Sequence, residues 1–133
     1  MLDAHGRVLE AVNARRVPEG ELAPGFRMHN HVSAVTDYEY YGVSGFGDWI
    51  RDVFEVFEDG ARYVAEEIIE VGEDYVAGRY SISGRGARSR SPLEFRWFGV
   101  TWFRDGRAVR AVGCSSRDEA VEAIRVGQGN QIS

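Results

Sequence analysis

The sequence predicts a single α+β domain, and three observations carry that prediction. Apolar residues recur at helical spacing in the first half of the chain, over residues 3–16 and again from Phe46 to Phe57. Residues 61–115 are instead rich in β-branched and aromatic residues, as strands are. Within that second half, Asp105-Gly106 is a turn dipeptide between two apolar runs, and a helical pattern follows. Together these features indicate helices packed on a largely antiparallel sheet.

Composition is that of an ordinary globular chain. The 133 residues, 44% of them hydrophobic and 28% charged, suit one domain with a real core. We expect this domain to span residues 1–127, followed by a polar tail at 128–133. No apolar run reaches the ~18 residues of a membrane span, and the charged start of the chain lacks the apolar segment of a signal peptide. With one cysteine, Cys114, a disulfide framework is excluded, so we expect a cytoplasmic protein without a membrane partner.

The charge pattern argues against nucleic acid as a partner. The net charge is −5, although all 16 basic residues are arginine. Arg85, Arg88 and Arg90 cluster in one segment, and an arginine-rich loop can contact phosphates. In an acidic chain, however, a solvated hairpin tip is the better interpretation of this segment.

The first elements are expected to be a helix and a strand. Residues 3–16 form an amphipathic pattern with Asp3 as N-cap and an apolar stripe of Val8, Leu9 and Val12. Prolines and glycines between Pro18 and Gly25 then predict turns. The strand covers residues 26–32, and its alternation places on one face Phe26, Met28, Asn30 and Val32.

The rest of the chain is predicted to form a second helix, four long strands and a last helix. A polar loop to Asp37 precedes a short extended piece at residues 38–42. Ser44 is placed to cap the second helix, whose stripe runs from Phe46 to Phe57 and which ends at Asp59-Gly60. Strands are predicted at 61–71, 75–83, 93–104 and 108–115, and a last helix begins at Arg117-Asp118.

The strand at 93–104 is apolar on both faces at its centre. The predicted helices can cover only one face of the sheet, so Phe98, Val100 and Trp102 on the other face need another cover. A second copy of the chain is the natural candidate. We therefore predict a homodimer through the outer, convex face of the sheet.

Four short motifs follow one another along the chain: Pro24-Gly25-Phe26, Gly42, Gly84-Arg85-Gly86 and Trp102-Phe103-Arg104-Asp105-Gly106-Arg107. Their order and spacing resemble those of the nuclear transport factor 2-like superfamily, and within it the SnoaL-like branch of polyketide cyclases. The resemblance covers nearly the whole chain. It implies a cone-shaped, curved antiparallel or mixed sheet wrapped around the N-terminal helices, a cystatin-like roll with an apolar pocket. Such folds host isomerases, cyclases, hydrolases, dehydratases and binding modules, so the fold alone does not settle function.

The pocket implied by the resemblance would be lined by the inward side of each strand and by residues near its open end. This lining suits a small hydrophobic ligand. The alternative is that the same residues simply fill the core. The predicted ligand-binding residues are Met28, Asn30, Tyr41, Trp49, Tyr80, Ile82, Phe95, Trp97, Ala111 and Gly113.

An epoxide hydrolase mechanism is not expected. Limonene epoxide hydrolases, which the last strands resemble, use an Arg-x-Asp pair and a later Asp. The later Asp aligns with Gly113, and the pair falls on Arg79-Tyr80-Ser81 or Tyr80-Ser81-Ile82, depending on register. Neither alignment supplies the first Asp, so the carboxylates that would activate water are absent.

An isomerase- or cyclase-like reaction needs a base and a donor to an enolate oxygen. Candidate bases are His29, His31, Asp37 and Asp48, of which Asp37 and His31 are preferred, and the preferred donor is Tyr80, with Asn30 and Tyr41 as other candidates. His29-x-His31 has no evident third ligand, so no metal is expected, and nothing indicates a cofactor. Cys114 is interpreted as a packing residue.

Two hypotheses therefore stay open. The favoured one is a module that binds a small apolar molecule without turnover, or whose pocket is filled. The alternative is an enzyme that transfers a proton on a hydrophobic carbonyl compound. A pocket His or Asp with a hydrogen-bonded partner would favour the enzyme, and a pocket without these residues would exclude it.

Overall fold

The computed structural model describes the backbone of residues 1–30 and 39–132, and the side chains of those residues up to Gly127. Within this part of the chain there are three α-helices, one short 3-10 turn and six strands. In chain order they are α1 (Leu2–Asn13), η1 (Glu19–Glu21), β1 (Leu22–Asn30), β2 (Glu39–Tyr41), α2 (Gly42–Phe54), β3 (Arg62–Val71), β4 (Tyr75–Arg85), β5 (Pro92–Arg104), β6 (Arg107–Cys114) and α3 (Arg117–Ile132).

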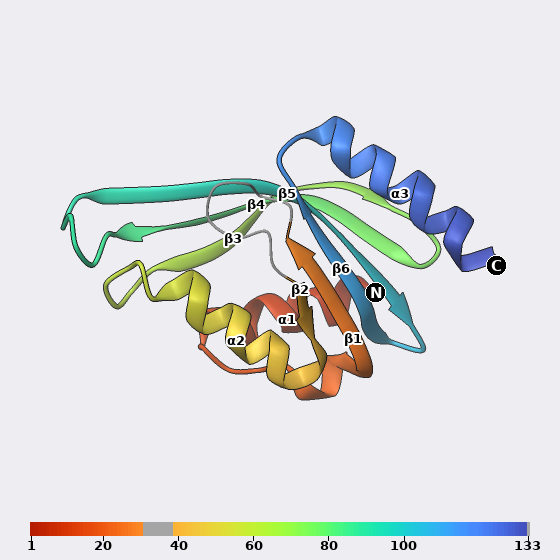
Figure 1. The fold of residues 1–133 in the computed structure, drawn as a ribbon, viewed down its shortest axis with the longest axis horizontal. Coiled ribbons are helices and arrows are strands. Elements are labelled where there is room, and N and C mark those ends of the chain that lie inside the picture. Colours follow the sequence, from red (N-terminus) through yellow and green to blue (C-terminus); the bar gives the residue numbers. More distant parts are fainter. Residues whose placement is uncertain (31–38, 133) are drawn as a thin grey trace.

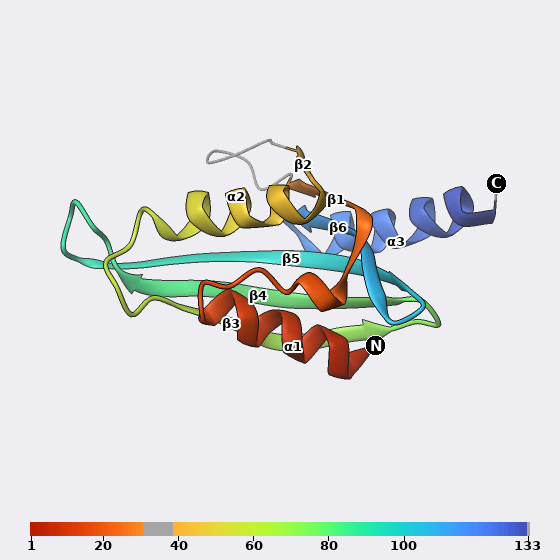
Figure 2. The same ribbon diagram turned by 90° about the horizontal axis from the view of Figure 1, so that it is seen from below.

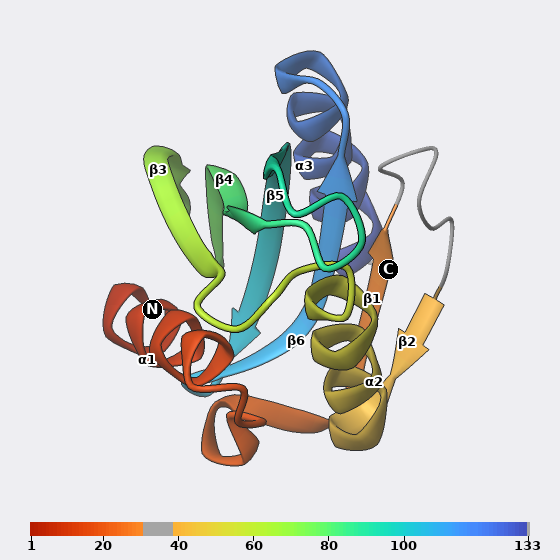
Figure 3. The same ribbon diagram turned by 90° about the vertical axis from the view of Figure 1, so that its left-hand side faces the viewer.

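The strands form one open mixed sheet in the order β2-β1-β6-β5-β4-β3 (Figure 1). β1 and β6 are parallel, and all other neighbours are antiparallel. α1 and α2 run along the strands on one side (Figure 2). Seen from its end, the sheet bends around these two helices, while α3 lies on the opposite side (Figure 3). We call the side of α1 and α2 the inner face and the side of α3 the outer face. The predicted α+β roll is thus confirmed.

The N-terminal helix begins and ends earlier than predicted. α1 covers Leu2–Asn13 with Met1 as N-cap, so Asp3 lies in the first turn, where its charge complements the helix dipole. Arg15 follows with a positive φ of 57°, a conformation that a helix cannot contain. The Asn13 side chain then bonds both backbone groups of Tyr63, at 2.8 Å each, which fixes the end of α1 against β3.

The first strand is longer and the second helix shorter than expected. β1 begins at Leu22 and absorbs Pro24 and Gly25, which were predicted as turn residues, through a shift of register against β6 between Leu22 and Arg27. α2 begins at Gly42 with Tyr41 as N-cap, so Ser44 is not the cap. It ends at Phe54, before Phe57.

The β5–β6 hairpin is confirmed. Asp105 and Gly106 have φ angles of 53° and 79°, the two positive values that a type I′ turn requires. The predicted alternation also holds on β5, since Phe103 packs with the inner apolar cluster and Trp102 with the outer one.

α3 covers the part of the outer face where Val100 and Trp102 lie, so these two residues do not need the second copy of the chain that was predicted to cover them. Phe98 is only partly buried, and the homodimer itself stays a prediction. Val100 and Trp102 are 0% and 1% exposed in the single chain, where they pack with Ala120 and Ile124 of α3. The approach is close, because a Cβ on Gly127 would fall 2.5 Å from the Trp102 ring. A second subunit is not needed to bury these residues.

The turn before α3 explains how this helix returns to the sheet. Only Ser115 and Ser116 separate β6 from α3. Ser116 Oγ accepts a hydrogen bond from the Glu119 N–H at 3.1 Å, and Glu119 Oε2 accepts one from the Ser115 N–H at 2.9 Å, as in a capping box. α3 then continues to Ile132, past the end of the domain predicted at residue 127.

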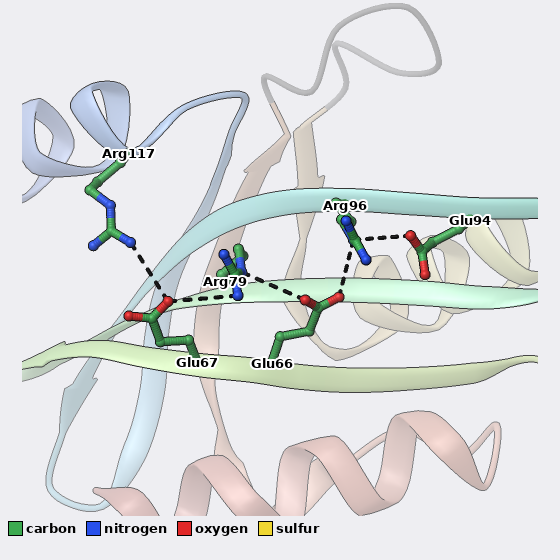
Figure 4. A network of polar contacts seen from close by, with 6 residues as sticks. All are labelled: Glu66, Glu67, Arg79, Glu94, Arg96 and Arg117. Atoms are coloured by element: carbon green, nitrogen blue, oxygen red, sulfur yellow. Dashed lines mark ion pairs between the residues drawn. The ribbon is translucent and has the colours of Figure 1, made fainter.

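Beside α3, the outer face is polar. Carboxylates from β3 and β5 alternate with guanidinium groups from β4, β5 and α3 in a chain of ion pairs (Figure 4). This chain consists of Arg117, Glu67, Arg79, Glu66, Arg96 and Glu94.

Candidate functional site

The inner face of the sheet lines a partly open cavity of about 150 Å³ together with α1 and α2. Most of its lining is aliphatic or aromatic. Eight of the residues predicted from the sequence to contact a ligand contribute to this lining: Met28, Asn30, Trp49, Tyr80, Phe95, Trp97, Ala111 and Gly113.

The space exists because a row of glycines crosses the sheet. Gly78 on β4 lies opposite Gly99 on β5, and Gly99 lies opposite Gly113 on β6. On β1 the row ends at Asn30, which is in register with Gly113. Three neighbouring strands therefore carry no side chain on the inner face at this level, and this absence leaves room above the sheet.

Tyr80 occupies part of that room. A Cβ on Gly78 would lie 2.9 Å from the Tyr80 hydroxyl, and a Cβ on Gly99 would lie 3.1 Å from its ring. The ring therefore leans over both glycines instead of standing up from the strand. Larger residues at either position would displace it.

Aromatic side chains hold Tyr80 in this orientation. Its ring stacks on Tyr63 at a centroid distance of 5.8 Å and on Trp97 at 6.3 Å, with interplanar angles of 23° and 27°. Trp49 from α2 meets the Tyr63 ring edge-on at 5.9 Å. These contacts give the cavity a continuous aromatic wall from β5 to α2.

The most significant polar group is one that sequence reasoning missed, His5. It is 6% exposed, it lines the cavity, and its Nε2 lies 2.7 Å from the Tyr80 hydroxyl. Burial lowers the pKa of His5 and raises the pKa of Tyr80. At neutral pH both groups are therefore uncharged.

A signal for His5 was present in the sequence. His5, Val8, Leu9 and Val12 follow i, i+3, i+4, i+7 spacing, which places them on one helical face, and all four line the cavity. The predicted stripe contains only its apolar members Val8, Leu9 and Val12, and His5 is its polar first member. A histidine inside an apolar helical stripe is the pattern that would have indicated it.

Asp52 on α2 is a second polar residue of the lining that was missed. Its Oδ2 accepts a hydrogen bond from the Tyr40 hydroxyl at 3.0 Å, and Arg51 Nη2 lies 3.5 Å from its Oδ1. Asp52 also belongs to a helical stripe, with Trp49 three residues before it and Val53 and Val56 after it. The cavity thus has one neutral hydrogen-bonded pair and one carboxylate that is already partnered.

Two residues predicted to contact the ligand lie outside the lining. β2 alternates, so Tyr40 points inward and is buried while Tyr41 is 58% exposed. Ile82 faces inward as predicted, but it is fully buried within the apolar cluster. Tyr41 therefore lies on the wrong face of its strand to reach the cavity, and Ile82 lies too deep in the core.

Of the predicted catalytic residues within the described part of the chain, Tyr80 lines the cavity, and so does Asn30, the other candidate donor. His31 and Asp37 fall outside the described residues. Asp48 lies on the exposed side of α2, 3.3 Å from Arg51. Cys114 is buried in the outer apolar cluster, and burial raises the pKa of its thiol to about 11, which agrees with a packing role.

Neither a metal site nor a membrane span is found in the described part of the chain. No group of three or more His, Cys, Asp or Glu residues there is arranged to hold a metal ion. No helix within residues 1–30 and 39–132 is long and apolar enough to cross a membrane.

The side chains of the arginine cluster, Arg85, Arg88 and Arg90, are all exposed.

Comparison with known proteins supports the fold. No family model and no curated protein matches the chain. Among solved structures, TerC co-crystallised with polyporic acid has a TM-score of 0.70 and 17% identity, over 93% of this chain and 97% of TerC. A putative SnoaL-like polyketide cyclase from Jannaschia sp. CCS1 has a TM-score of 0.69 and 16% identity, over 92% of this chain and 88% of that one.

A third similar structure is an NTF2-like protein of unknown function from Burkholderia pseudomallei K96243. Its TM-score is 0.69 at 20% identity, over 91% of this chain and 94% of that one. The resemblance to NTF2-like and SnoaL-like proteins is therefore confirmed for the fold. Identities this low establish no shared activity.

Proposed function

We propose that this protein binds a small, largely apolar molecule in the cavity of its inner face. The observation that supports the proposal is the cavity of about 150 Å³ with its apolar lining, in which Gly99 and Gly113 leave space above the sheet. Ligand sites combine such a lining with a few placed polar groups, and the His5–Tyr80 pair is of this kind. TerC, of the same fold, was co-crystallised with a small molecule, polyporic acid.

Toluene is a suitable probe, because it is apolar and of the right size. We expect saturable shifts in the NMR signals of residues that line the cavity when the protein is titrated with toluene. The matched control is Ala111→Leu, which places a larger side chain in the lining and should abolish the shifts. A wild-type protein without saturable shifts, or a control that responds equally, would contradict the proposal.

Proton transfer on the bound molecule is a second candidate function, and the His5–Tyr80 hydrogen bond favours it. When Nε2–H donates to the Tyr80 oxygen, the Tyr80 O–H can donate to an enolate oxygen, and His5 Nδ1 keeps the lone pair of a base. Burial keeps His5 neutral, as a base must be. Asp37 and His31 remain further candidates for the base.

Hydrogen–deuterium exchange at the α-carbon of acetophenone in D₂O tests this second function. We expect the wild type to accelerate exchange, and His5→Gln and Tyr80→Phe to reduce the rate at least about a hundredfold, in the range typical of a lost general acid or base. Exchange no faster than in buffer would exclude the reaction for this ketone. An unchanged rate in His5→Gln would exclude His5 as the base.

A further inference from the structure

We infer that the ligand is a neutral molecule of about one six-membered ring with a single oxygen substituent, which hydrogen bonds to the His5–Tyr80 pair. This inference rests on the proposed function and specifies its ligand. It is carried by the volume of the cavity, by the charges of its lining and by the hydrogen bond between His5 and Tyr80.

The volume sets the size of the ligand. The cavity measures about 150 Å³, and an apolar cavity of about that volume accommodates benzene. A fused second ring would exceed this volume, so it would have to extend toward the open side of the cavity or displace wall residues, which are held by the stacking of Tyr80 between Tyr63 and Trp97. The aromatic wall also favours a ring as the occupant, through offset and edge contacts.

The charges of the lining exclude ionised ligands. The described lining contains no Arg, so a carboxylate ligand would be buried without a counter-charge. Its one carboxylate is that of Asp52, which already accepts a hydrogen bond from Tyr40 and lies 3.5 Å from Arg51. An ammonium group would therefore compete with an existing pair. The uncharged His5–Tyr80 pair instead suits a neutral polar group.

The hydrogen bond between His5 and Tyr80 leaves capacity for one oxygen of a ligand. If Tyr80 donates to His5 Nε2, its oxygen retains a lone pair that can accept from a ligand hydroxyl. If Nε2–H donates to Tyr80 instead, the Tyr80 O–H can donate to a hydroxyl or a carbonyl. A phenol suits both arrangements, and a cyclic ketone suits the second.

Phenol and toluene form a matched pair of probes, since they differ by a hydroxyl in place of a methyl group. The quantity to measure is the ratio of their affinities, by NMR titration, in the wild type and in Tyr80→Phe. We expect Tyr80→Phe to lower the affinity for phenol relative to toluene about five- to tenfold, the effect of one hydrogen bond. Because the ratio is taken within each variant, a general loss of stability cancels.

A second variant and two further probes complete the test. Val121→Ala lies on the exposed side of α3 and outside the cavity lining, so it should keep the phenol-to-toluene ratio within about twofold of wild type, whereas loss of structure would weaken both probes alike. Benzoate should not bind, and 2-naphthol should bind more weakly than phenol.

The outcomes separate this inference from the proposed function. If toluene and phenol bind but Tyr80→Phe leaves their ratio unchanged, the inferred contact is wrong and the binding function stands. Tight binding of benzoate would overturn the inferred charge, and tight binding of 2-naphthol the inferred size. If neither toluene nor phenol binds the wild type, the proposed function itself fails.

Discussion

The inner and outer faces of the sheet are built from adjacent residues of the same strands, yet one face is hollow and the other is filled. Across β4, β5 and β6, residues that pair in register form two adjacent rows. The outer row consists of Ala77, Val100 and Val112, and the inner row of Gly78, Gly99 and Gly113. The three residues of the outer row are buried under α3, at 1%, 0% and 5% exposure.

This difference shows how a sheet can be both a packing surface and a wall of a binding site. Each strand contributes one apolar side chain outward and none inward at this level. The outer row can therefore be covered closely by a helix, while the inner row leaves space that α1 and α2 border but do not fill. Outer-face residues should accordingly be sensitive to changes of volume, and residues around the cavity should tolerate them.

The largest effect is expected from truncation on the filled face. Trp102→Ala should lower the free energy of unfolding by about 3–5 kcal/mol, since it removes a large side chain that is 1% exposed and leaves a void beneath α3. Urea unfolding followed by circular dichroism measures this change. The control is Val121→Ala on the exposed side of α3, where the side chain is 56% exposed, and it should change stability by less than about 0.5 kcal/mol.

Two outcomes of the Trp102→Ala experiment would contradict the claim that α3 fills the outer face. A cost of less than about 1 kcal/mol for Trp102→Ala would mean that the face is not closely packed in solution. An unfolding midpoint that rises with protein concentration would mean that another chain, and not α3, covers the residue.

The second effect comes from the same substitution made on each face. Ala77→Leu adds volume to the filled outer cluster, where Ala77 is 1% exposed, and should destabilise by about 1–3 kcal/mol. Ala111→Leu adds the same atoms at the cavity wall and should change stability by less than about 1 kcal/mol, because space is available. The difference between the two urea midpoints is the measurement. Equal costs would contradict the claim that only the inner face is hollow.

A smaller effect is expected from pH, through His5. Burial lowers the pKa of His5 in the folded protein below the ~6.5 of an unfolded chain. Stability is therefore full above about pH 6.5 and is lost as the pH falls toward the folded pKa, where the buried imidazole must take up a proton. Tyr80, its hydrogen-bonded neighbour, stays protonated over this range because burial raises its pKa.

Urea midpoints at pH 7.5 and pH 5.5 test this effect, and His5→Gln serves as the control. The variant should lose part of the difference between the two midpoints. Glu66 does not interfere in this window. Its hydrogen bond with Ser81 lowers its pKa from the ordinary acidic value, so its contribution is lost only at lower pH. An identical difference in wild type and variant would show that His5 is not the group that titrates.

Much of this comparison could be predicted from the sequence, because alternation along a strand is a local property. The residues Phe95 and Trp97 were assigned to the inner side and Trp102 to the outer side from position alone, and the structure agrees. The turn at Asp105-Gly106 was equally local, since two successive positive φ values favour that dipeptide.

The cover of the outer face could not be predicted in the same way. Whether a helix returns over a sheet depends on the geometry of the turn before it, here Ser115-Ser116, and on close contacts such as Gly127 against Trp102. His5 was missed for a related reason. Its position 75 residues from Tyr80 becomes meaningful only when α1 is placed over β4, although its place in the stripe with Val8 and Val12 was a usable sign.

The smallest effect concerns the polar part of the outer face, where α3 is joined to the sheet by Arg117. Its guanidinium pairs with Glu67 at 3.6 Å (Figure 4). The same group lies 5.8 Å above the centre of the Phe98 ring. Because Arg117 and Glu67 are about half exposed, Arg117→Gln should cost about 1 kcal/mol or less, and less still in high salt. Urea unfolding at low and high NaCl measures both. A loss as large as that of Trp102→Ala would mean that ion pairs, and not buried apolar contact, hold α3 on the outer face.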